Sequence, residues 1–184
     1  MHVSLDDVPM ELPAAATLGE LLDGIAPQVE PGRLVTRVEV DGTPADPSDA
    51  GRMARWRLAG AEAITIHTEA PSEFAASRRQ EIAAHLRRIA DLLSAVADAF
   101  VAGDTIRANR GLAGAARELG LVLELDRRLV ALDHGPSRCD GVAETVRRVG
   151  PRLEEAERTR RWNEVASLLA KELVPALRAT YVEA

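Results

Sequence analysis

Apolar and polar positions alternate over short stretches at the start of the chain, a pattern typical of β-strands. Val3 and Leu5 alternate with polar neighbours, Asp6-Asp7-Val8-Pro9 has the residues of a turn, and alternation resumes over Met10-Glu11-Leu12. Residues 2–12 are therefore predicted to form a β-hairpin.

A short helix is predicted next, followed by two further strands. Thr17 precedes a segment with apolar residues on one face, and Glu20 stands three positions after it, which is the spacing of a capping box. The helix is expected over residues 18–26. Strands are expected over residues 34–40, which end at Asp41-Gly42, and over residues 63–68. The predicted order is ββαβ, an irregular connection, then β.

This order resembles the β-grasp fold of ubiquitin-like and sulfur-carrier domains over residues 1–70. The likeness is carried by the first hairpin and by three stretches that follow it: Thr17-Leu18-Gly19-Glu20-Leu21-Leu22, Arg37-Val38-Glu39-Val40-Asp41-Gly42 and Gly60-Ala61-Glu62-Ala63-Ile64-Thr65-Ile66. Carriers of this family end in a free Gly-Gly tail whose carboxylate is activated. Here the last strand runs on through Glu69-Ala70-Pro71, so carrier chemistry is not expected.

Helical spacing takes over after Pro71, and Ser72 is the predicted N-cap at this boundary. Helices are predicted over residues 73–101, 105–132, 138–159 and 162–181. Apolar residues of the first follow at spacings of 4, 3, 4, 3 and 4, which is a heptad-type seam: Ile82, Leu86, Ile89, Leu93, Val96 and Phe100.

Asp104 is the predicted N-cap of the second helix, Gly150-Pro151 should bend or split the third, and Pro175 should kink the last. Short connections between amphipathic helices predict an antiparallel bundle of about four helices. The predicted fold class is α+β, with a β-grasp-like domain over 1–70 and a helical bundle over 72–184. Salt bridges with the acid first are expected at i,i+4: Glu124/Arg128, Glu144/Arg148 and Glu154/Arg158.

Composition and charge narrow the function classes. Only 3% of residues are aromatic against 46% hydrophobic, so the core must be mainly aliphatic. The net charge of −6 is uneven, because residues 1–70 carry 5 Arg against 12 Asp and Glu, and the remainder is nearly balanced. Binding to nucleic acid through charge has little support. One cysteine, no signal peptide pattern and no long apolar run indicate a cytoplasmic protein.

Candidate catalytic or metal-binding residues are sparse. His134, Cys139 and Asp140 share one loop but lack further ligands nearby, so a polar loop in which Asp140 helps to cap the next helix is favoured over zinc or Cys/His chemistry. His85 is expected to be partly buried and paired with Glu81. No catalytic residues, metal ligands or cofactor site are predicted.

Three glycines interrupt the second long helix, and each costs roughly 1 kcal/mol relative to alanine. Fraying of the helix start is favoured as their explanation over a close helix contact or a ligand against bare backbone: Gly111, Gly114 and Gly120.

The function predicted is that of a non-catalytic protein–protein interaction protein, an adaptor or chaperone-like protein of a bacterial cytoplasm. The segment from Arg161 to Leu177, which contains most of the last predicted helix, resembles the closing helix of flagellar-chaperone-like bacterial proteins, which implies an association with secretion or the flagellum. The alternative is a small-molecule-binding or enzymatic protein with a pocket between the domains, near Trp56, His67 and His85.

A homodimer through the helices is also predicted. The seam from Ile82 to Phe100 is about 27 Å long at 1.5 Å per residue, longer than a bent third helix covers. Apolar residues beside Leu93 and along residues 119–125 widen the stripe beyond one face. The alternative is a closed monomer in which the sheet covers that face.

Overall fold

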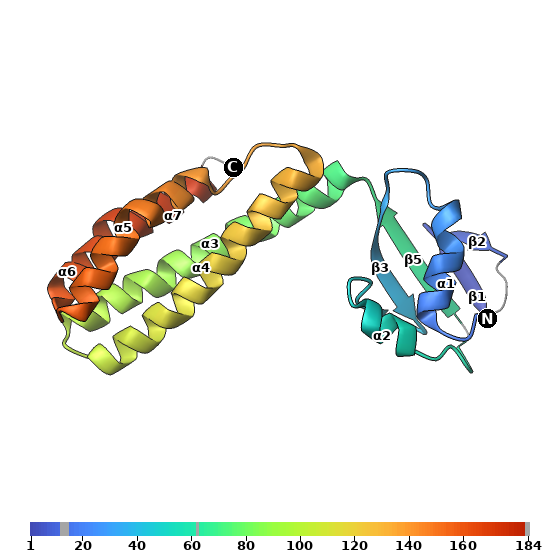
Figure 1. Cartoon of the computed structure of the whole chain (residues 1–184), viewed down its shortest axis with the longest axis horizontal. Coiled ribbons are helices and arrows are strands. Elements are labelled where there is room, and N and C mark those ends of the chain that lie inside the picture. The colour runs from blue at the N-terminus through green and yellow to red at the C-terminus, as the bar shows by residue number, and fades with distance from the viewer. Residues whose placement is uncertain (12–14, 62, 183–184) are drawn as a thin grey trace. The chain divides into compact units, whose positions relative to one another are not determined.

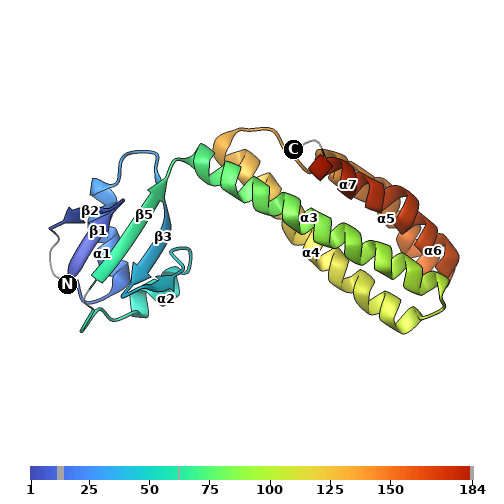
Figure 2. The same cartoon turned by 180° about the vertical axis from the view of Figure 1, so that it is seen from behind.

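A computed structural model describes residues 1–11, 15–61 and 63–182 of the chain. Contacts between residues divide the chain into two compact units, and the boundary along the chain lies between Phe74 and Ala75. Strands and short helices form the first unit and long helices form the second, which agrees with the predicted α+β class (Figure 1, and from behind in Figure 2).

One mixed sheet is built from the described residues of the first unit, in the order β2-β1-β5-β3-β4. Neighbouring strands are antiparallel except β1 and β5, which are parallel. Its strands are β1 (His2–Leu5), β2 (Val8–Met10), β3 (Leu34–Val40), β4 (Thr43–Ala45) and β5 (Ala63–Glu69).

Helix α1 (Leu18–Ile25) lies across one face of this sheet (Figure 1). Leu18 and Leu21 of α1 are buried in one core with Val38 and Ile66 of the sheet. The predicted N-cap is confirmed, because the Glu20 amide donates to Thr17 Oγ1 over 3.3 Å, whereas the Glu20 carboxylate accepts the Ala16 amide over 2.8 Å in place of the Thr17 amide of a capping box. A 3-10 turn, η1 (Ala26–Gln28), and a second helix, α2 (Ala50–Arg55), complete the unit.

Two tight turns correct the predicted strands. Asp6 and Asp7 both have positive φ, 48° and 65°, so two residues close the first hairpin and β2 begins at Val8 rather than Met10. Leu12 lies outside the described residues. Asp41-Gly42 closes a second hairpin with φ of 50° and 75°, and β4 therefore follows where an irregular connection was expected.

The second unit contains long helices joined by short connections. Helix α3 (Pro71–Val101) is followed by α4 (Thr105–Asp133), which returns beside it, and by α5 (Asp140–Arg158). Helix α6 (Trp162–Leu168), a π-helical turn η2 (Leu169–Leu173) and α7 (Val174–Val182) then pack back along α5.

The residues at which α3 and α4 begin agree in part with those predicted from the sequence. Asp104 Oδ1 accepts the Arg107 amide over 3.1 Å, which confirms the predicted cap of α4. Helix α3 begins at Pro71, a position where a missing amide proton costs nothing. Ser72 is therefore inside the helix, and Glu73 instead accepts the Ala70 amide.

The prolines inside α5 and in the last helix have different effects on the helix around them. Helix α5 is not split, because it runs unbroken through Gly150-Pro151. The last helix changes to the π-helical turn η2 just before Pro175. A wider turn is one way to accommodate a proline, which lacks an amide proton and clashes with the carbonyl four residues earlier.

The predicted seam of α3 is confirmed, since its six residues are at most 3% exposed. Phe100 at its end stacks on Trp162 with ring centroids 5.3 Å apart. The apolar surface that the seam was expected to leave uncovered is therefore absent. Exposed apolar side chains of α4 lie elsewhere, at Ile106, Leu121, Leu125 and Leu132.

Candidate functional site

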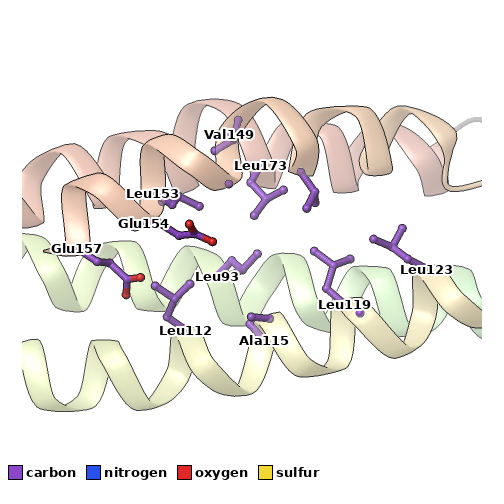
Figure 3. A pocket seen from close by; sticks show the side chains of 14 residues that line it. Leu93, Leu112, Ala115, Leu119, Leu123, Val149, Leu153, Glu154, Glu157 and Leu173 are labelled. Carbon is purple, nitrogen blue, oxygen red and sulfur yellow. The ribbon is translucent and has the colours of Figure 1, made fainter.

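An apolar groove runs between α4 and α5, and one part of it is a cavity of about 320 Å³ (Figure 3). Leucine, valine, alanine and glycine residues form most of its wall, with Leu93 of α3 and Leu173 of η2 at its floor. Helix α4 contributes Leu112, Ala115, Ala116, Leu119, Gly120 and Leu123; helix α5 contributes Val146, Val149, Gly150, Leu153, Glu154 and Glu157.

A second hollow, of about 460 Å³, continues the first along the same two helices. Both hollows share Gly120 and Leu123, and the second extends to Val130 on α4 and Asp140 on α5. At 1.5 Å per residue, the distance from Leu112 to Val130 is about 27 Å. We call the two hollows together the α4–α5 groove.

Small residues create the space in this groove. A Cβ atom added at Gly120 or Gly150 would meet no atom within 4 Å. Leu112, Leu123 and Leu153 are only half-buried along the rims. The groove thus exposes apolar side chains around a channel that the chain itself does not fill.

Two carboxylates line one end of the groove. Glu154 and Glu157 stand one turn apart on α5, and Figure 3 shows both side chains beside Leu93, Leu112 and Leu153. Burial, together with the charge of Glu154, raises the pKa of Glu157.

The expected partner of Glu154 is occupied elsewhere, because Arg158 binds Glu155 over 2.6 Å. Arg148 likewise binds Glu172 rather than Glu144. Of the three predicted i,i+4 pairs, only Glu124 with Arg128 forms.

A buried aspartate anchors the loop at the other end of the groove. Asp126 is 2% exposed and accepts three hydrogen bonds: from Ser137 Oγ over 2.6 Å, from the Arg138 amide over 3.2 Å and from the Cys139 amide over 3.4 Å. The backbone before α5 is therefore held by a side chain of α4. Asp126 is not among the residues that the sequence pattern indicated.

A second aspartate of α4 is bound at the same end. Both terminal nitrogens of Arg79 donate to the Asp133 carboxylate, over 2.6 and 2.7 Å, and both side chains are nearly buried. Arg79 thereby connects α3 to the end of α4. These hydrogen bonds lower the pKa of Asp133 to about 2.

This ion pair predicts a pH dependence of stability. Because the pKa of Asp133 is lower in the folded protein, the pair stabilises fully above about pH 4, and its contribution is lost as the pH falls toward 2. Urea unfolding at pH 5 and pH 2.5 measures the loss. We expect a smaller loss in Asp133→Asn than in the wild type, and an equal loss in both would contradict this assignment.

The loop His134 to Asp140 differs from its prediction. His134 is exposed and ends α4 with a φ of 54°, whereas Cys139 is buried rather than on the surface. Asp140 does not cap α5 through its side chain, because it is the first helical residue, and the Cys139 amide is bound by Asp126. Within the described ranges, no group of three or more His, Cys, Asp or Glu residues is gathered for a metal ion.

The Cys139 thiol is predicted to be unreactive in the folded protein. Burial and the charges of Asp126 and Asp140 raise its pKa to about 12, and only the thiolate reacts with alkylating reagents. Iodoacetamide at pH 8 should modify Cys139 more than about 100-fold faster in 8 M urea than in buffer. Rapid stoichiometric modification of the folded protein would be the opposite result.

The predicted pairing of His85 with Glu81 and the predicted fraying at the start of α4 are both wrong. His85 is exposed, and its ring lies 2.8 Å from an Arg88 nitrogen, while Glu81 binds Arg78. Helix α4 does not fray before Gly111. A Cβ atom there would lie 2.6 Å from Val96 of α3, so Gly111 serves a close helix contact.

None of the helices in the described part of the chain has the length and apolar character needed to cross a membrane. Comparisons with protein families, with curated proteins and with solved structures give no significant match for this chain.

Proposed function

We propose that this is a non-catalytic protein–protein interaction protein, adaptor or chaperone-like, whose second unit holds an amphipathic helix of a partner in the α4–α5 groove. The length of the groove carries the proposal, because about 27 Å corresponds to about 18 helical residues. A helix laid with its apolar face in a hydrophobic groove is a recurring mode of peptide recognition. The half-buried rims at Leu112, Leu123 and Leu153 would be covered by such a helix.

The first unit supports the β-grasp interpretation through its sheet order and through α1 on one face. Its edge strands β2 and β4 have three residues each, and the central residue of each is a proline, Pro9 or Pro44. Proline cannot donate to a neighbouring strand and protects sheet edges against strand addition. These edges are poor sites for an extended peptide, which favours the helical groove as the partner site.

A small-molecule ligand is the second candidate function. A cavity of about 320 Å³ is near the lower limit for such ligands. The described lining of this cavity contains two glutamates one turn apart and neither a nucleophile nor a metal-binding group beside them, which favours binding over catalysis. The predicted pocket near Trp56, His67 and His85, the cytoplasmic location and the link to secretion or the flagellum stay predictions.

Blocking the groove tests the proposal. Gly120 lines both hollows, so Gly120→Phe should fill the channel without displacing the core. Gly114→Phe is the matched control, because Gly114 is on the same helix, also has open space around it, and lines neither hollow. Fluorescence anisotropy would follow the binding of 18-residue amphipathic helical peptides that share one leucine face.

We expect Gly120→Phe to weaken peptide binding at least about tenfold and Gly114→Phe to leave it unchanged. The proposal fails if no such peptide binds, or if both variants bind the peptides as the wild type does. Circular dichroism confirms that both variants keep their helices.

The homodimer is proposed through α4, where Leu121 is 67% exposed and Leu125 and Leu132 lie on the same side. One chain has a mass of 19.8 kDa, and if a second copy covers these leucines, light scattering at micromolar concentration should give twice that mass. The variant Leu121→Gln/Leu125→Gln should then return the mass to that of one chain. A wild-type mass of one chain, unchanged on tenfold concentration, would reject the dimer.

A further inference from the structure

We infer that the α4–α5 groove selects a basic amphipathic helix, in which two lysines or arginines one turn apart pair with Glu154 and Glu157. This inference rests on the proposed function and adds the chemical class of the partner.

Acidic residues predominate along the groove. A single basic residue, Arg127, lines its described part, against five acidic residues. Arg127 is already bound, because its Nε and one terminal nitrogen donate to Glu124 over 2.9 Å each. The five are Glu124, Asp126, Asp140, Glu154 and Glu157.

The acids in the groove differ in how far they are satisfied. The carboxylate oxygens of Asp126 accept hydrogen bonds from the loop before α5, and Glu124 is bound by Arg127 and Arg128. Glu154 and Glu157 line the first cavity together, and the negative charge of Glu154 adds to the cost of ionising Glu157. A partner cation placed there would offset both burial and repulsion.

The apolar walls around these carboxylates define the rest of the ligand. A helix that covers Leu112, Leu123 and Leu153 also excludes water from the glutamates, and a charge pair in a dry site is stronger than one at the surface. Side chains at i and i+3 or i+4 of a helix are neighbours, so two basic residues at that spacing match two glutamates at i and i+3.

Three peptides with one shared leucine face test the inference. They differ only at two positions one turn apart, which are lysine, glutamine or glutamate. Anisotropy should show that the lysine peptide binds at least about tenfold more tightly than the glutamine peptide, and that the glutamate peptide binds most weakly. Glu154→Gln/Glu157→Gln should remove the preference for lysine while the glutamine peptide still binds.

The matched control is Glu144→Gln/Glu155→Gln, which removes two charges from α5 outside the groove, where each glutamate is bound to its own arginine. The preference for lysine should survive in this variant. Its equal loss in both double variants, or no preference in the wild type, overturns the inference.

The outcomes separate the inference from the proposed function. If Gly120→Phe abolishes peptide binding but the wild type binds the lysine and glutamine peptides equally well, the groove remains a binding site for a helix. Only the basic character of the partner is then rejected. Octylamine is a further probe, with one cationic head and one apolar chain. If it displaces the lysine peptide at equimolar concentration, the occupant is a small amphiphile and the inference is wrong.

Discussion

Asp126→Ala is expected to lower the free energy of unfolding by roughly 3 kcal/mol, since hydrogen bonds to a charged group contribute about 1.5–3 kcal/mol and orphaned buried donors add to the loss. The substitution removes the acceptor of the Ser137 hydroxyl and of the Arg138 amide. The Cys139 amide keeps its second acceptor, Ser137 Oγ, at 3.1 Å. Urea unfolding followed by circular dichroism measures the change.

Asp140→Ala is the matched control for this prediction. Asp140 is exposed in the first turn of α5, where a carboxylate contributes only about 0.3–1 kcal/mol through the helix dipole. Asp126→Asn keeps one acceptor oxygen and should fall between the two alanine variants. Equal losses for Asp126→Ala and Asp140→Ala would show that the anchor does not stabilise the fold.

Local patterns predicted the parts of the fold that neighbouring residues determine. The seam from Ile82 to Phe100 could be predicted because every position of it is apolar and its spacing is helical. The caps at Thr17 and Asp104 could be predicted because the donor lies three residues from the acceptor. In each case the interaction is decided within one or two turns.

The anchors at the end of the groove could not be predicted in this way. Asp126 and Asp133 continue the buried spacing of Leu119, Val122 and Leu129 on α4, but an aspartate in such a seam looks like an interruption. Their partners are distant in sequence, by 11 residues for Ser137 and 54 for Arg79. A pattern of apolar residues has no means to identify those partners.

The groove itself depends on two helices at once. From the sequence alone, Gly120 was interpreted as a residue that lets the helix fray, since a glycine weakens a helix wherever it occurs. Only its position opposite α5, with Gly150 and Leu153 across the channel, makes the glycine open a cavity. Strand β4 was missed for a different reason, because it has only three residues and contains Pro44.

Gly111→Ala is expected to destabilise the protein by roughly 1–3 kcal/mol, although alanine is the better helix former. Its Cβ would lie 2.6 Å from Cγ2 of Val96, a side chain that is 3% exposed. A valine in a helix has one strongly preferred rotamer, so it cannot turn away at little cost. Helices α3 and α4 would have to separate, and urea unfolding measures the loss.

Gly114→Ala is the control, because it is the same substitution three residues later, where an added Cβ meets nothing within 4 Å. This substitution should stabilise the protein by about 0.5–1 kcal/mol, because alanine is the better helix former and restricts the conformations of the unfolded chain. Val96→Ala alone creates a cavity, whereas Gly111→Ala/Val96→Ala returns a methyl group to that space, so the double variant should be more stable than the sum of the single losses predicts. Additive losses, or a Gly111→Ala variant as stable as Gly114→Ala, would mean that α3 and α4 do not depend on this close approach.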